Sequence, residues 1–262
     1  MYNGIALYGT ESIAPSLAIE IGISFFNLFN INISSAGYSK YLENGDHEGD
    51  HETIIIPLSM LKNKIKKGEK LSFRIYSENK NNVPWLASFG YSTNEFGGFH
   101  HIDMQCPIQD KKNILGFIRD FLSKIDFSYG IVYTFDEITN AYFYSSGGNL
   151  LTKFTNESPS AFKKETLRCL RGSESYKGSM LRMVYPINIL NRKHLQLNVF
   201  GESLDKWMLS NEFNGKLEKI NDKLWVWIVD EDHMDDLNNY CGKAGILISW
   251  KPQIKKTAPK LP

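Results

Sequence analysis

The sequence has few cysteines and no cysteine motif. Cys106, Cys169 and Cys241 are the only three in 262 residues, and they are too widely spaced to form a C-x-x-C pair. An odd number of scattered cysteines argues against a disulfide framework or a cysteine-ligated zinc site, and indicates free thiols in a reducing compartment. All three lie in or near apolar runs, so we expect core cysteines without a catalytic role.

The sequence also lacks a long apolar run and a basic leader. Its most apolar stretch, residues 19–29, is interrupted by Gly22, Ser24 and Asn27 and is too short to span a bilayer. Residues 1–5 contain no basic side chain, which favours a first strand over a signal peptide. These absences predict a cytoplasmic protein that does not insert into a membrane.

Neither sign of charge dominates the chain. The formal net charge is +1, with 23% charged and 42% hydrophobic residues, a composition typical of soluble globular proteins. A chain of this length can bury the core of one large domain or of two smaller ones. Because no overall positive field attracts nucleic acid, we do not expect a nucleic-acid partner.

One motif is specific enough to test. His47-Glu48-Gly49-Asp50-His51 is an H-E-x-x-H sequence, which on a helix places two zinc-binding histidines beside a general base. Here the surrounding residues 43–52 include two glycines and no apolar residue. Glycine costs about 1 kcal/mol in a helix interior relative to alanine, and a buried helix needs an apolar stripe. We therefore predict an exposed acidic loop.

A metal site assembled from two segments is the alternative. Residues 99–104 are expected to form a strand, in which alternation puts His101 and Asp103 on one face and His100 on the other. With His47, Glu48 and His51 from the loop, these residues could supply the ligands and base of a metal-dependent hydrolase or nuclease. This hypothesis requires the loop and the strand to meet in space.

The pattern of apolar residues predicts an α+β protein. Strands are expected at residues 3–9, 31–34, 53–56, 71–76, 85–91, 99–104, 129–135 and 246–250, with a hairpin that turns at Asn221-Asp222. Helices are expected at residues 15–29, 57–68, 111–125, 159–170, 203–210 and 233–241. In the best-patterned helix, at 111–125, one stripe contains Ile114, Ile118, Phe121, Leu122 and Ile125. We expect a mainly antiparallel sheet with helices packed on one face.

The order of these elements suggests two regions. Strand, helix and strand follow one another at 3–34 and again at 99–135, which fits either two related βαβ-containing halves or a common local arrangement. A Ser-, Gly- and Asn-rich loop at 145–160 separates an N-terminal α+β region, 1–150, from a C-terminal α+β region, 151–250, and the two could pack as one domain. Residues 251–262 carry four lysines and three prolines and are expected to form a flexible tail.

Two acidic clusters stand out in this nearly neutral chain. The first contains Asp46, Glu48, Asp50 and Glu52, and the second contains Asp230, Glu231, Asp232, Asp235 and Asp236. The second precedes and opens an expected helix, where acids also stabilise the positive end of the helix dipole. Concentrated acid on a neutral protein can steer it onto a basic partner.

Tryptophans on the expected hairpin are the other candidate contact residues. Trp225 and Trp227 could anchor a protein partner or stack on nucleotide bases. Core packing is the alternative in a chain with 13% aromatic residues.

The last third of the chain resembles a known class of bacterial proteins. The resemblance rests on Leu181-Arg182-Met183-Val184-Tyr185-Pro186-Ile187-Asn188-Ile189-Leu190, His194-Leu195, the segment from Gly201 to Trp207, Trp225-Val226-Trp227 and Ala244-Gly245-Ile246-Leu247. These segments are similar to immunity proteins, small cytosolic proteins encoded beside polymorphic or secretion-delivered toxins. The resemblance implies a non-enzymatic inhibitor without a cofactor, which binds one cognate protein toxin and blocks its active site. It carries over no catalytic residue and does not say which surface binds the toxin. The charge of the acidic clusters and the aromatic character of the two tryptophans make these the expected partner-binding residues.

Overall fold

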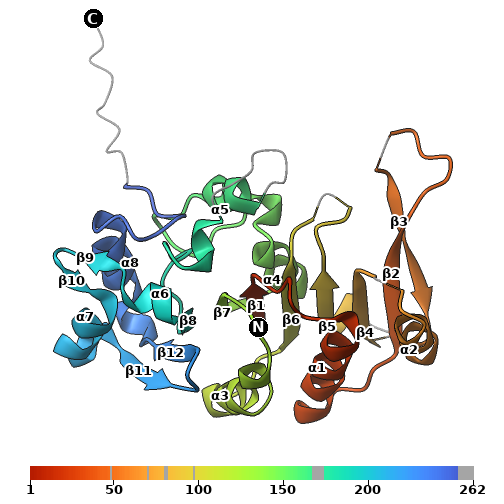
Figure 1. Cartoon of the computed structure of the whole chain (residues 1–262), viewed down its shortest axis with the longest axis horizontal. Coiled ribbons are helices and arrows are strands. Elements are labelled where there is room, and N and C mark those ends of the chain that lie inside the picture. The colour runs from red at the N-terminus through yellow and green to blue at the C-terminus, as the bar shows by residue number, and fades with distance from the viewer. Residues whose placement is uncertain (48, 70, 80–81, 97, 167–173, 253–262) are drawn as a thin grey trace, which may run out of the picture.

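One large antiparallel sheet organises the chain (Figure 1). The computed structural model describes residues 1–47, 49–69, 71–79, 82–96, 98–166 and 174–252. Within these residues ten strands follow the order β11-β12-β8-β7-β1-β6-β5-β4-β2-β3, and every neighbouring pair is antiparallel. The strands are β1 (Tyr2–Tyr8), β2 (Ser35–Tyr41), β3 (His51–Ile56), β4 (Phe73–Asn79), β5 (Asn82–Ser92), β6 (His101–Pro107), β7 (Tyr129–Phe135), β8 (Ile187–Asn191), β11 (Lys216–Lys219) and β12 (Leu224–Ile228). A separate short hairpin joins β9 (Asn198–Val199) to β10 (Glu202–Ser203).

Helices connect these strands. The α-helices are α1 (Pro15–Leu28), α2 (Leu58–Lys66), α3 (Lys111–Asp120), α4 (Ile138–Ser145), α5 (Pro159–Thr166), α6 (Arg192–Leu195), α7 (Leu204–Ser210) and α8 (Met234–Lys243). Short 3₁₀ turns include η1 (Leu122–Lys124), η2 (Gly148–Leu150), η4 (Ser175–Lys177), η5 (Glu212–Asn214) and η6 (Glu231–His233). None of the helices in the described ranges combines the length and the apolar character that crossing a membrane requires.

Alternation along the central strand β1 creates two cores. Ile5 and Leu7 face the core that α1, α2 and α3 complete, whereas Ala6 and Tyr8 face the core that α4, α5, α7 and α8 complete. The predicted α+β class with a mainly antiparallel sheet is confirmed. The helices cover both faces of the sheet instead of the one face expected, because β1 and β7 bury apolar side chains on both faces.

The two strand–helix–strand units share a geometry. Since β1 pairs antiparallel with both β6 and β7, these two strands are parallel to each other, and α3 crosses between them. In the same way α1 carries the chain from β1 to the parallel strand β2. Both helices lie on the same face, where the rings of Phe25 and Phe117 are 5.8 Å apart. The sheet continues past residue 150, since β8 pairs with β7.

Three expected elements differ in the structure. The strand expected at 31–34 begins at Ser35, because Asn30 ends α1 with a left-handed φ of 54° and the ladder with β4 starts only at Ser35. The helix expected at 111–125 ends at Asp120, since Phe121 is its C-cap, with φ stretched to −119°, and the chain tightens into η1. The segment expected as a strand at 246–250 forms no continuous ladder. It makes isolated bridges at Leu247 and Trp250, each with a single residue of another segment.

Several elements were absent from the prediction, among them α4, α6, β8, β9 and β10, and two predictions fall partly outside the described residues. Helix α4 lies between the strand expected at 129–135 and the loop expected at 145–160, where no element was predicted. Strand β8 of the large sheet was not predicted either. The helix starting at Pro159 is described to Thr166, and residues 253–262 of the expected tail lie outside the described ranges, as does Cys169. Cys106 and Cys241 are free and buried as predicted, and burial raises the pKa of each thiol to about 12.

Candidate protein-binding surface

Asp46 and Asp50 of the first acidic cluster lie on the loop that joins β2 to β3 and projects beyond the sheet, and Glu52 lies on β3 (Figure 1). The Leu42 N–H donates to the Asp50 carbonyl (2.9 Å), and the His47 N–H donates to Asp50 Oδ2 (3.0 Å), which closes the hairpin loop. Asp46 and Glu52 are exposed, Asp50 is half-buried, and Glu48 lies outside the described residues. The predicted exposed loop is confirmed.

The second acidic cluster lies at the other end of the sheet. Asp230 precedes η6, Glu231 and Asp232 are within it, and Asp235 and Asp236 open α8; all five are exposed. The strand order separates this cluster, which follows β12, from the first cluster beside β3. The two clusters therefore belong to different surfaces.

The tryptophan pair lies mainly in the core. Trp227 is fully buried, donates its Nε1–H to the Asn214 carbonyl (2.7 Å) and packs against Trp207. Its expected role as a surface anchor is therefore wrong, since alternation on β12 directs this side chain into the second core. Trp225 points to the same side and is half-buried against that core.

Instead, exposed apolar side chains gather on α7, η5, α8 and the turn between β9 and β10. Leu209 is 73% exposed, Phe200 59%, Phe213 57% and Tyr240 41%. We call these four residues, together with His233, the α7–α8 surface. Single exposed apolar residues are common on soluble proteins, whereas a group of them marks an interaction site.

Ring contacts hold this surface in a defined arrangement. Phe213 meets His233 with ring centroids 5.0 Å apart, and Phe200 meets Tyr240 at 4.9 Å. Tyr240 in turn stacks on the buried Trp207 at 5.2 Å, with the two rings nearly parallel. Because these contacts reach the core, little side-chain freedom remains to be lost on binding a partner.

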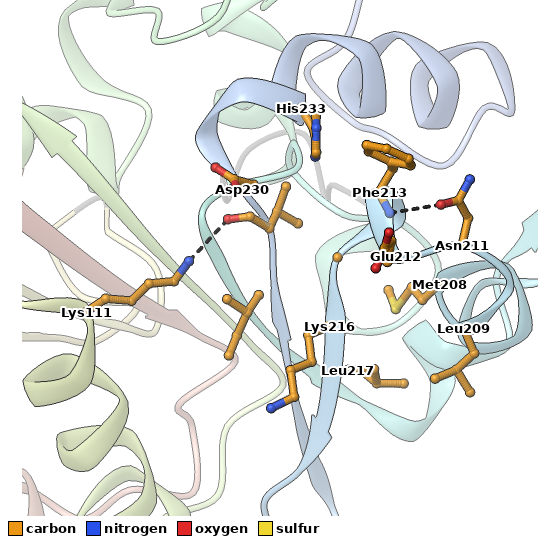
Figure 2. A pocket seen from close by; sticks show the side chains of 13 residues that line it. Lys111, Met208, Leu209, Asn211, Glu212, Phe213, Lys216, Leu217, Asp230 and His233 are labelled. Atoms are coloured by element: carbon orange, nitrogen blue, oxygen red, sulfur yellow. Dashed lines mark hydrogen bonds between the residues drawn. The ribbon is translucent and has the colours of Figure 1, made fainter.

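Two open hollows share the Phe213–His233 pair. The larger, about 890 Å³, extends along β11 and β12, and Lys111 of α3 closes one side by donating to the Val229 carbonyl (3.3 Å) (Figure 2). The smaller, about 490 Å³, lies between α7 and α8. Figure 2 also shows the Phe213 N–H donating to Asn211 Oδ1 at 3.0 Å, which fixes the start of η5.

Acidic side chains border both hollows. Glu202 and Asp236 line the smaller one, which has no lysine or arginine among its described lining residues. Glu212 and Asp230 line the larger one, opposite Lys111 and Lys216. With Glu231, Asp232 and Asp235 nearby, acid predominates around an aromatic centre.

Phe200 is presented by a strained turn. It and Gly201 form the two-residue loop between β9 and β10, with φ values of 52° and 104°. A type I′ turn requires positive φ at both positions and favours Asn-Gly, whereas a bulky residue there is a steric outlier. The chain thus holds an exposed phenyl ring in a conformation that costs folding free energy.

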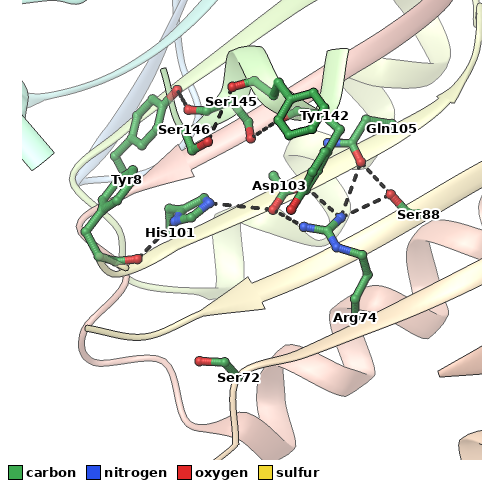
Figure 3. Close-up of polar contacts among 12 residues, drawn as sticks. Tyr8, Ser72, Arg74, Ser88, His101, Asp103, Gln105, Tyr142, Ser145 and Ser146 are labelled. Atoms are coloured by element: carbon green, nitrogen blue, oxygen red, sulfur yellow. Dashed lines mark hydrogen bonds and ion pairs between the residues drawn. The ribbon is translucent and has the colours of Figure 1, made fainter. Parts of the chain in front are cut away.

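A separate polar network lies under α4 (Figure 3). Arg74 donates to both carboxylate oxygens of Asp103 (2.8 and 2.7 Å) and lies over the Tyr142 ring at 4.5 Å. Gln105 Nε2 donates to Asp103 Oδ2 (2.8 Å). Burial opposes ionisation of Asp103, but the adjacent Arg74 guanidinium prevails and lowers the pKa of this carboxyl.

This network contains half of the predicted metal site. His101 Nε2 lies 3.6 Å from Asp103 Oδ1, which confirms that these side chains share a face, and burial lowers the pKa of His101. His47 and His51, however, are exposed beside the edge strand β3. Four strand spacings of about 4.8 Å, roughly 19 Å in total, separate β3 from β6.

The metal-site hypothesis therefore fails on geometry. Among the described residues no group of three or more His, Cys, Asp or Glu side chains could hold a metal ion. Asp103 also already pairs with Arg74 through both oxygens, so the network is a structural ion pair in the centre of the sheet.

Comparison with known proteins gives one fold relative. No protein-family model matches the chain, and no curated protein matches its sequence. Among solved structures, the fold is similar to that of the Pseudomonas aeruginosa T6SS protein PA0821, with a TM-score of 0.53 and 12% sequence identity. The match covers 98% of this chain and 77% of that chain. At this identity the likeness establishes a shared fold.

Proposed function

We propose that this chain is a cytoplasmic immunity protein that binds a cationic protein toxin through the α7–α8 surface and blocks it sterically. The observation that carries the proposal is the contact between the exposed Phe213 and the half-buried His233, a pair shared by two hollows that are lined by the acidic residues Glu202, Glu212, Asp230 and Asp236. No catalytic group or cofactor is needed for this mechanism.

The composition of the surface fits tight binding to a protein. Binding energy at interfaces is concentrated in a few aromatic and large side chains that lose contact with water at the centre. Phe213, Phe200, Leu209 and Tyr240 can fill this role, and the acidic rim can steer a basic partner to them.

Two further observations support a role beside a secretion system. The C-terminal third, whose sequence resembles immunity proteins, contains α7, η5 and α8. The fold also resembles that of a protein named as part of the T6SS of Pseudomonas aeruginosa. A toxin that acts on nucleic acid has a positively charged cleft for its substrate. The acidic residues of the α7–α8 surface would be attracted to such a cleft.

Co-expression tests this function. The protein encoded immediately upstream is expressed in a laboratory bacterium alone, and then together with this chain. We expect growth to stop in the first case and to recover in the second.

Leu209→Lys should abolish the recovery, because it places a positive charge at the most exposed residue of the surface. The control is Leu150→Lys, the same change at a residue that is 65% exposed and lines neither hollow. A harmless upstream protein, or full recovery with Leu209→Lys, would contradict the proposal.

A further inference from the structure

The outer side of β3 is an edge of the large sheet. β3 is the last strand in the order and pairs only with β2 among the described residues. We propose that β3 pairs antiparallel with β3 of a second copy of the chain, so that the two sheets join across a two-fold axis. This inference does not rest on the proposed function, since it concerns the opposite end of the sheet.

The outer side of β3 carries backbone N–H and C=O groups that pair with no other strand among the described residues. The bond from Leu42 N–H to the Asp50 carbonyl identifies a hydrogen-bonded residue pair just before the strand. Since bonded and non-bonded pairs alternate in an antiparallel ladder, Glu52, Ile54 and Ile56 bond to β2. The N–H and C=O groups of His51, Thr53 and Ile55 then point outward. If the two-fold axis passes beside Thr53, Thr53 of one copy lies opposite Thr53 of the second copy. His51 of each copy then lies opposite Ile55 of the other.

The side chains on β3 do not guard this edge. Natural edge strands are usually protected by proline, lysine, a bulge or a covering loop. Here the strand ends in Thr53-Ile54-Ile55-Ile56, four β-branched residues that favour strand pairing. Ile55 is 56% exposed, and the nearby Tyr41, Leu42 and Met60 are 48%, 43% and 51% exposed. An antiparallel copy would cover Ile55.

Charge favours a second copy over another kind of partner. β3 begins at the acidic loop, where Glu43, Asp46 and Glu52 are exposed, and it ends at Ile56, just before the basic helix α2. This helix lies beside β2, with Lys64 over the Tyr38 ring. Lys62 within the helix and Lys66 and Lys67 at its C-terminal end are exposed. Antiparallel pairing places the acidic loop of each copy beside α2 of the other. A strongly cationic or anionic strand would be repelled by one half of this edge.

The mass of the purified full chain in solution, measured by light scattering and sedimentation across a concentration series at low salt, tests the pairing. We expect a dimer of twice the 30.0 kDa chain mass. Ile55→Lys should shift the protein to monomer, with at least a tenfold weaker dimer. Ile108→Lys, the same change at a residue 52% exposed and away from this edge, should leave the dimer intact. A monomer at every concentration, or a dimer unaffected by Ile55→Lys, would overturn the proposal.

A charge exchange then tests the antiparallel direction. Reversing Glu43, Asp46 and Glu52 to Lys should weaken the dimer, and so should reversing Lys62, Lys66 and Lys67 to Glu. Both sets of changes in one chain restore opposite charges across the axis, so they should recover the dimer. If the combined variant is as weak as either single set while its circular dichroism and melting match the parent, the antiparallel arrangement is wrong.

Discussion

Phe213 and His233 meet edge to face, with ring centroids 5.0 Å apart, where two hollows of the surface adjoin. One ring comes from η5 and the other from η6, so their contact joins two segments that are 20 residues apart in sequence. A partner that covers this pair would contact both hollows and the acidic residues around them. The position of the pair makes it the expected centre of an interface.

The second acidic cluster should control how fast the partner binds. Reversing Asp230, Glu231 and Asp232 to Lys is expected to slow association tenfold or more with a smaller effect on dissociation, because long-range charge mainly sets the association rate. Stopped-flow or surface binding kinetics at two salt concentrations measures this effect. Reversing Glu43, Asp46 and Glu52, at the other end of the sheet, is the control. Equal slowing by both sets would show that the α7–α8 surface is not the contact.

Phe200→Asn should stabilise the fold while weakening binding. Asn-Gly is the favoured pair for a turn with two positive φ values, so we expect a gain of roughly 1 kcal/mol in unfolding free energy from relief of the left-handed strain. Urea denaturation measures the gain, and the same protein is assayed against the partner. Phe200→Leu, which keeps a side chain of similar polarity in the strained conformation, is the control. No gain in stability would mean that the turn is not strained.

The Arg74–Asp103 pair should be costly to break from one side. Asp103→Asn leaves the buried guanidinium without its counter-charge, and we expect a loss of roughly 3–5 kcal/mol in unfolding free energy. Replacing both residues, with Arg74→Met and Asp103→Leu, should recover most of this loss, because neither desolvated charge remains. A double-mutant cycle in urea gives the coupling. A loss below about 1 kcal/mol for Asp103→Asn, the range of surface changes, would contradict a buried ion pair.

His194 should make the fold sensitive to mild acid. Its Nε2 donates to the Tyr176 carbonyl (2.9 Å), its Nδ1 accepts from the Asn191 N–H (3.3 Å), and burial lowers its pKa from 6.5 to about 4. Between these values the unfolded chain binds a proton that the folded chain does not, so stability falls as pH drops from 6.5 to 4. The expected loss is on the order of 3 kcal/mol.

The non-titrating variant His194→Gln isolates this effect. It should be less stable than the parent at pH 7 and should lose less stability between pH 6.5 and 4. The lowered pKa of Asp103 acts mainly below the range of a free carboxyl, and His101, whose pKa burial also lowers, contributes to the slopes of both proteins, so the difference between the slopes reports His194. Parallel acid titrations of the two proteins, followed by urea melts at each pH, compare the slopes. Identical slopes would rule out His194 as the acid-sensitive group.

Local patterns in the sequence predicted most of the elements. Apolar periodicity located α1, helix start and stop signals located α2, α7 and α8, and the glycines and acids of residues 43–52 excluded a zinc-binding helix. Over α3 and η1 apolar periodicity placed Ile118 and Leu122 correctly, but Phe117 is the fully buried aromatic and Phe121 is only half-buried. The helix ends before Phe121, and a pattern of spacing alone does not register that ending.

The binding surface was harder to predict because it depends on tertiary arrangement. Trp227 and Leu209 are both large apolar residues, and only the packing of α7 against β12 decides that the first is buried and the second exposed. One local signal was available, since a phenylalanine precedes glycine in a two-residue turn where asparagine is usual. The strand order, which separates the two acidic clusters, involves pairings between distant segments that no short motif encodes.

Hydrogen–deuterium exchange of this chain, alone and saturated with its toxin, tests the central claim most directly. If the α7–α8 surface is the contact, backbone amides of residues 199–214 and 231–241 should gain protection, while those of β2 and β3 should exchange at the rates of the toxin-free protein. Protection confined to other segments, or no change at residues 199–214 and 231–241 in a complex shown to be saturated, would contradict the account.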